Sequence, residues 1–180
     1  MLPSLAVKTL VLSSKVPQRL FDAACSVPGL EALHVKWSAI ESLEAVRKLR
    51  SLRALFLGSS PGIACLAPIS SLCGLEHLFI ENVQDPVDLS FLEELRELRE
   101  FGLAAPRGRQ LRVRTLEPLG SLPHVQLLWL VGLQVQEGGL APLHSLRQLA
   151  SLRTTMKASS TELRALRAAV PTLRHFQPVG

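Results

Sequence analysis

The chain has 180 residues, of which 47% are hydrophobic and 19% are charged. This length suits one domain with its own core, and the composition is typical of a globular protein rather than a disordered one. A charge or a turn residue interrupts every apolar run before the roughly 20 residues that a membrane span needs. We therefore expect a single globular domain that does not enter a membrane.

The net charge of +5 is unevenly distributed along the chain. Residues 1 to 100 carry 10 Lys and Arg against 12 Asp and Glu, whereas residues 101 to 180 carry 10 against 3, which gives −2 and +7. Such asymmetry can mark an anionic partner, although a solvated charged face is the commoner cause. Binding of nucleic acid or another polyanion through the basic half is therefore the alternative hypothesis.

The three cysteines, Cys25, Cys65 and Cys73, include no C-x-x-C pair and have no histidine at a matching spacing. This pattern argues against a disulfide framework and against a zinc site. We expect them to be buried small apolar residues in a reducing compartment, which favours the cytoplasm. The opening residues, MLPSLAVKTLVLSSK, have no basic region before their apolar part and no clear cleavage site, so they are expected to belong to the folded domain.

The motif L-x-x-L-x-L recurs along the whole chain, and the alternation at its end is typical of a half-buried β-strand. Its copies start 22 to 27 residues apart. They begin at Val7, Leu30, Leu52, Leu75, Leu98, Val125 and, in a decayed form, Leu152. The sequence therefore predicts about seven strand-forming repeats.

Each predicted strand is followed by apolar residues three positions apart, a spacing that suits a short helical or 3₁₀ segment with one buried edge. The copy after the strand at 33–37 has Ile40, Leu43, Val46 and Leu49. Later copies have Ile63, Leu66, Ile69 and Leu72, then Leu89, Leu92 and Leu95, then Leu116, Leu119 and Leu122, then Leu140, Leu143, Leu146 and Leu149.

These motifs resemble the leucine-rich repeat family, in particular its short subclass of about 22 residues. The resemblance covers nearly the whole chain. It implies one domain over residues 1–180 with an α/β solenoid fold, a horseshoe whose concave side is a parallel β-sheet and whose convex side carries the short helical returns. The family usually has Asn or Cys at the ninth position, where this chain has Lys15, Ser38, Ser60, Val83, Pro106, Leu133 and Ser160. The three serines could satisfy part of the turn backbone.

A solenoid exposes its core at both ends unless the ends are covered. Near the C-terminus, Ser159 and Glu162 form a capping-box pattern, and Pro171 marks a stop. We therefore expect a capping helix near residues 160–170. At the N-terminus only MLPSL precedes the first strand.

The sequence contains no G-x-S-x-G nucleophile motif, no phosphate-binding P-loop, no H-E-x-x-H zinc-protease motif and no EF-hand calcium loop. Five histidines fall on different repeats, and His34 and His77 would start roughly 10 Å apart on strands spaced about 4.8 Å. We therefore predict that the protein is not an enzyme and uses no cofactor or metal.

The residue between the last two apolar positions of each motif points away from the core onto the concave surface. This column reads Val11, His34, Phe56, Phe79, Gly102, Trp129 and Met156. Single exposed apolar residues are ordinary, but a contiguous patch of large ones usually marks an interaction surface. Trp37 lies nearby and could add to the patch. The alternative is that the rings cover one another and stabilise the sheet. The separation of Trp129 from the phenylalanines by Gly102 argues against that alternative.

The repeats that start at Leu98 and Val125 each carry five extra residues, within AAPRGRQLR and VGLQVQEGG. Adjacent loops of this kind predict a lip beside the concave face, and such loops often carry specificity. Arg107, Arg109, Arg112 and Arg114 suit recognition of an acidic patch, although a solvated basic loop has the same composition.

The resemblance implies protein binding, and the column of concave-face residues that contains the rings is the expected binding surface. The sequence thus predicts a non-catalytic protein-interaction module, of which an inhibitor or immunity-type protein that occludes its partner is one version. The partner-binding residues expected are His34, Trp37, Phe56, Phe79, Trp129, Met156 and the four arginines. No nucleic-acid-binding module is recognisable, so a protein partner is favoured over nucleic acid.

Overall fold

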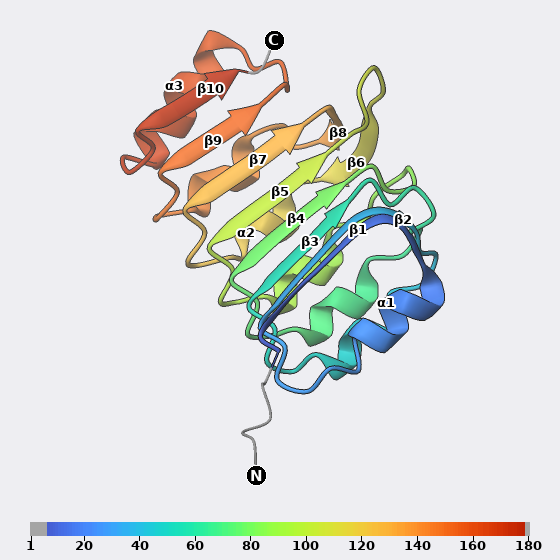
Figure 1. Cartoon of the computed structure of the whole chain (residues 1–180). Coiled ribbons are helices and arrows are strands. Elements are labelled where there is room, and N and C mark those ends of the chain that lie inside the picture. The colour runs from blue at the N-terminus through green and yellow to red at the C-terminus, as the bar shows by residue number, and fades with distance from the viewer. Residues whose placement is uncertain (1–6, 179–180) are drawn as a thin grey trace.

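The computed structural model describes residues 7–178 and contains a solenoid built around one long parallel sheet. Eight strands follow one another in the order β1-β2-β3-β4-β5-β7-β9-β10, with the helical segments on one side (Figure 1). The strands are β1 Thr9–Pro17, β2 Ala32–Ala39, β3 Ala54–Gly58, β4 His77–Glu81, β5 Glu100–Ala104, β7 Leu127–Val131, β9 Ser151–Thr154 and β10 His175–Pro178. We call the sheet face opposite the helical segments the concave face.

The returns between strands follow the three-residue apolar spacing. In η1, Val46 N donates to Leu43 O and Leu49 N donates to Val46 O, so that each buried side chain begins a new three-residue turn. Because a 3₁₀-helix repeats every three residues, this spacing keeps one edge of the segment against the core. The 3₁₀ returns are η1 Glu44–Lys48, η2 Ala67–Ser71, η3 Ser90–Glu94 and η4 Ala141–Ser145, and the α-helical ones are α1 Gln18–Ala24, α2 Glu117–Gly120 and α3 Ser160–Ala169.

The core is a set of rows in which equivalent side chains of successive repeats stack. One row, fixed by the strand register, is Leu33, Leu55, Leu78, Phe101, Leu128 and Leu152. Each of these side chains is at most 1% exposed. Full burial stabilises such a side chain by about 1.5–3 kcal/mol relative to exposure, so these rows hold the repeats together.

The last predicted repeat is in the wrong register. Strand β9 pairs Leu152 with Leu128 and Arg153 with Trp129, so this repeat starts at Leu149 rather than at Leu152. The degenerate motif misled the prediction because Thr154, which replaces the final apolar residue, is polar yet fully buried. Met156 therefore lies beyond β9, and its predicted place in the concave column is wrong.

The predicted C-terminal helix is α3, and Ser159 and Glu162 form its capping box. The pKa of Glu162 is lowered because its carboxylate accepts hydrogen bonds from the backbone and hydroxyl of Ser159. The helix is not the last element, however, since β10 follows it and pairs in parallel with β9. It is the return of the seventh repeat and leads into an eighth. The sequence reading missed the eighth repeat because its motif positions hold Phe176 and Pro178.

The extra residues of the two long repeats form strands rather than a lip. Strands β6 Leu111–Thr115 and β8 Leu133–Glu137 make a separate two-stranded parallel sheet in which Leu111 pairs with Leu133 and Val113 with Val135. Leu111, Val113 and Leu133 are buried and extend the core. The turn between β5 and β6 extends past the ends of the main strands (Figure 1).

The N-terminal end of the solenoid is less covered than its middle. Leu10 and Leu12 of β1 are half-buried, whereas the equivalent Leu33 and Val35 of β2 are fully buried. The residues MLPSL, which were expected to precede the first strand within the folded domain, lie outside the described residues. Among the described residues, no helix has the length and apolarity to cross a membrane.

The ninth-position serines were expected to bond to turn backbone, but two of them bond to each other instead. Ser38 Oγ donates to Ser60 Oγ at 2.7 Å, and both side chains are buried. Ser160 instead begins α3 and is exposed. All three cysteines are free, but only Cys25 is buried, so the expected burial of Cys65 and Cys73 is wrong.

Candidate functional site

The strand register aligns the residues predicted for the concave column in all but the last repeat. Val11, His34, Phe56, Phe79, Gly102, Trp129 and Arg153 lie side by side across seven neighbouring strands. His34 is exposed, and the three large rings of Phe56, Phe79 and Trp129 are half-buried. We call His34, Phe56, Phe79 and Trp129 the aromatic column.

The rings of the aromatic column touch in sequence. His34 stacks on Phe56 with a centroid distance of 5.9 Å, Phe56 lies 6.4 Å from Phe79, and Phe79 meets Trp129 edge to face at 6.3 Å. Aromatic pairs in this range contribute about 0.5–1.5 kcal/mol beyond their area burial. The column is therefore a continuous, ordered strip whose rings keep part of their surface open to solvent.

Gly102 makes the contact between Phe79 and Trp129 possible. A Cβ at this position would lie only 2.3 Å from Cδ1 of Phe79, so the phenylalanine ring occupies the space above the glycine. The expectation that Gly102 separates Trp129 from the phenylalanines is wrong for this reason. Gly58 has the same relation to Phe56, with a Cβ 2.6 Å from Cε1 of the ring.

Arg153 continues the column beyond Trp129. Its guanidinium carbon lies 4.7 Å from the centroid of an indole ring, a cation–π geometry. The Nε of Arg153 and the Nε1 of Trp129 are both buried and have no hydrogen-bond partner among the described residues. Two N–H donors without acceptors thus lie together at this end of the column.

Trp37 lies near the end of β2, toward the other end of the sheet, in an unusual backbone conformation. Its φ is 56° and its side chain is 56% exposed, with Lys36 Nζ 5.0 Å from its ring centroid. Ser59, Asn82 and Gly132, which have the same place in later repeats, also have positive φ. These small or polar residues tolerate the left-handed region, whereas a bulky residue there is an outlier that costs roughly 1–2 kcal/mol.

A row of alternating charges, which the sequence reading missed, runs beside the column. Lys8, Glu31, Arg53, Glu76 and Arg99 occupy one position in successive repeats, and the backbone N–H of each donates to the carbonyl of the one before. Lys8 Nζ lies 2.6 Å from a Glu31 oxygen, and Arg53 and Arg99 each lie 3.4 Å from a Glu76 oxygen. Aligning the second residue of each motif copy would have revealed this charge row.

His77 is also on this face, but in the column next to the aromatic one. Its Nδ1 lies 3.2 Å from Glu100 Oε2 on the neighbouring strand. His34, by contrast, stacks on Phe56. The two strand histidines therefore have separate partners, and no group of three metal-ligating side chains occurs within residues 7–178.

The four arginines of the long repeat do not form one cluster. Arg107 and Arg109 are exposed on the turn before β6, whereas Arg112 and Arg114 are within β6. Arg112 Nε lies 2.7 Å from Asp85 Oδ2, and Arg114 Nε lies 3.4 Å from Glu137 Oε1. The pKa of Asp85 is lowered, chiefly because its carboxylate accepts hydrogen bonds from the backbone and guanidinium of Arg112.

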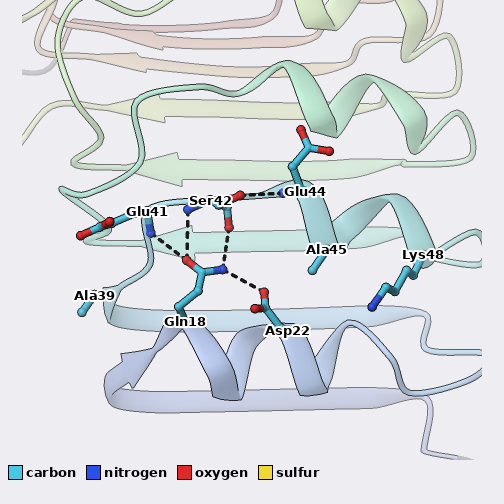
Figure 2. Close-up of a pocket in the computed structure, with 8 residues that line it drawn as sticks. All are labelled: Gln18, Asp22, Ala39, Glu41, Ser42, Glu44, Ala45 and Lys48. Atoms are coloured by element: carbon cyan, nitrogen blue, oxygen red, sulfur yellow. Dashed lines mark hydrogen bonds between the residues drawn. The ribbon is translucent and has the colours of Figure 1, made fainter.

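A hollow of about 650 Å³ between α1 and η1 lies away from the concave face. Figure 2 shows Gln18 inside it, with its amide nitrogen donating to Asp22 and to Ser42 O and its amide oxygen accepting from the backbone of Glu41 and Ser42. Since three of these hydrogen bonds join Gln18 of α1 to Glu41 and Ser42 before η1, this side chain connects the first return to the next repeat. The hollow has no nucleophile and base in contact, and we assign it a structural role.

Three solved structures share this architecture. Internalin C2 of Listeria monocytogenes matches with a TM-score of 0.70 at 19% identity, over 93% of this chain and 69% of its own. The internalin InlF of the same bacterium matches with a TM-score of 0.74 at 20% identity, over 94% of this chain and 47% of its own. A leucine-rich repeat protein of Leptospira interrogans matches with a TM-score of 0.66 at 17% identity, over 85% and 38%.

The chain has the leucine-rich repeat fold. The parallel sheet and the short helical returns agree with this likeness over most of the chain. The chain spans less than half of the length of two of these three structures. No protein-family model matches the sequence, and neither does any curated protein.

Proposed function

We propose that this chain is a non-catalytic protein-binding module that binds a partner protein through its concave face. The observation that carries the proposal is the aromatic column, a continuous strip of rings in mutual contact that keep part of their surface open to solvent. Phe, Trp and Met are enriched at the cores of protein interfaces, and leucine-rich repeat solenoids use extended concave surfaces for binding.

Trp37 supports the proposal from a second direction. The exposure of the Trp37 indole and the left-handed conformation of its backbone are both unfavourable. Strained residues of this kind cluster at functional sites. The binding surface we propose therefore contains His34, Trp37, Phe56, Phe79 and Trp129. We include Met156, which follows β9, and the exposed Arg107 and Arg109 of the turn before β6 as further candidates. Arg112 and Arg114 contribute less to the proposed binding because each already has an acidic partner.

A protein that occludes an active surface of its partner, as an inhibitor or immunity-type protein does, is one form of this function. An ordered strip of rings without a nucleophile–base pair suits occlusion of a partner better than catalysis. The alternative, polyanion binding by the basic half, has less support because the cations there are dispersed over β6, α3 and the sheet. A cytoplasmic location is consistent with three free cysteines.

The test is a quantitative affinity purification with matched baits. The wild-type chain is compared with a Phe56→Ala/Phe79→Ala variant and with a Glu93→Ala/Glu97→Ala control, whose residues are exposed on the helical side. A protein enriched equally by wild type and control, and at least about tenfold less by the aromatic variant, supports the proposal, since central aromatic residues dominate binding energy. Partners that are all retained by the aromatic variant would contradict it.

A further inference from the structure

The charges along the sheet are balanced at one end and unbalanced at the other. The charge row alternates from Lys8 to Arg99. Its next three positions are Gln126, Ala150 and Arg174, each of which donates its backbone N–H to the carbonyl of the row residue before it. The alternation thus stops at β7, and Arg174 has no acidic neighbour in the row.

The last three strands contain no carboxylate at all. Strands β7, β9 and β10 read LLWLV, SLRT and HFQP. Arg153, Lys157 and Arg174 lie on or beside them, and none of these three forms an ion pair within residues 7–178. This end of the sheet is therefore positively charged and without ion-pair partners among the described residues, in contrast to Arg112 and Arg114, which are paired.

The aromatic column ends inside this positive region. Arg153 stacks on Trp129, and each of the two side chains has a buried N–H without an acceptor. Leaving such a donor without a partner costs about 1–3 kcal/mol. A carboxylate that drew the guanidinium toward itself would form charge-assisted hydrogen bonds with an arginine that carries five donors. The same movement would uncover the Trp129 ring for an apolar neighbour.

We propose that the C-terminal end of the concave face, strands β7, β9 and β10, recognises a segment of the partner protein that carries an Asp or Glu next to an apolar side chain. Arg153 binds the carboxylate and Trp129 contacts the apolar side chain. The inference rests on the proposed function, and it assigns the recognition of acidic groups to Arg153 rather than to the arginines of the long repeat.

The experiment selects peptides from a random display library on the immobilised wild-type chain and then measures the affinity of the enriched peptides for variants. Arg153→Gln removes the proposed contact, and Arg153→Lys keeps the charge but loses the planar fork. Arg164→Gln is the control, because Arg164 is exposed on α3 and its side chain makes no hydrogen bond or ion pair within the described residues. Denaturation curves of all variants verify that each one folds.

Enrichment of acidic peptides that bind Arg153→Gln at least about tenfold more weakly, with Arg153→Lys in between and Arg164→Gln within about twofold, supports the inference. Peptides that need Phe56 and Phe79 but neither a carboxylate nor Arg153 overturn it and leave the proposed function standing. A library that yields no peptide sensitive either to Arg153→Gln or to Phe56→Ala/Phe79→Ala contradicts both. A labelled single-stranded oligonucleotide serves as the second probe, and if it binds through Arg153 while acidic peptides do not, the partner is a nucleic acid and the inference is wrong.

Discussion

Replacing Gly102 by alanine tests how the aromatic column is assembled. The new Cβ would lie 2.3 Å from Cδ1 and 2.7 Å from Cε1 of Phe79, so either the backbone at residue 102 or the phenylalanine ring must move. Gly102 belongs to the buried middle of the sheet, whereas the ring of Phe79 is half open to solvent. The ring is therefore the part that moves, and it swings away from Trp129.

The expected change in the free energy of unfolding is small. Loss of the edge-to-face contact between Phe79 and Trp129 costs about 0.5–1.5 kcal/mol. Alanine has less conformational freedom than glycine in the unfolded chain, which stabilises the folded protein by about 0.4–1 kcal/mol. This gain applies here because the φ of Gly102 is not in the left-handed region. The net loss should thus stay below about 1 kcal/mol, against about 2–5 kcal/mol for Leu103→Ala, whose side chain is fully buried.

Urea unfolding in a Trp37→Phe background, where Trp129 is the single tryptophan, measures both effects. Gly102→Ala should change the native emission and near-ultraviolet circular dichroism of Trp129. In a Phe79→Ala background the same substitution should be neutral or stabilising, because nothing remains above the glycine. A loss greater than about 3 kcal/mol, or an equal loss in both backgrounds, would refute this account of the column.

Three further predictions use the same measurements. Phe56→Ala should lower the free energy of unfolding by about 1–2 kcal/mol, well below the roughly 2–5 kcal/mol of the buried Leu55→Ala; equal losses would make the ring structural. The lowered pKa of Asp85 means that its carboxylate stabilises the fold above the ordinary carboxyl pKa of about 4, and that this stabilisation disappears as the pH falls through the lower native value. Wild type and Asp85→Asn should therefore differ in melting temperature near neutral pH and converge at about pH 2, and a difference that persists there would assign the effect to packing. Burial raises the pKa of Cys25 to about 12, so a thiol reagent should label two cysteines of the native protein quickly and the third only on unfolding.

Most of the fold could be predicted because the repeat appears in the sequence many times over. A single Leu at position 55 says little, but the same pattern at 33, 78 and 128 fixes the strand, its buried face and its register. The prediction failed where the pattern lost its leucines. Thr154 and Pro178 hold motif positions in the last two repeats, and apolar spacing cannot detect a buried threonine or an edge proline.

The aromatic column was predictable in its membership but not in its contacts. Alternation places Phe56 and Phe79 on the concave face, because successive side chains of a strand point to opposite faces. It says nothing of how far a ring leans, and so it could not show that Phe79 crosses Gly102 to reach Trp129. The ion pairs of Arg112 and Arg114 were hidden for a related reason, since Asp85 is 27 residues away from Arg112.

The mutual packing of the rings and their proposed role in binding are compatible. Each ring of the column is fixed by its neighbours at centroid distances of 5.9 to 6.4 Å, so little side-chain entropy remains to be lost when a partner covers the exposed part. Because ordering a mobile side chain at an interface costs about 0.5–1.5 kcal/mol, a pre-packed strip binds more tightly than the same rings left free. Contacts that stabilise the sheet therefore also prepare the surface for a partner, and Gly102, which contributes no side chain of its own, serves both by giving Phe79 its place.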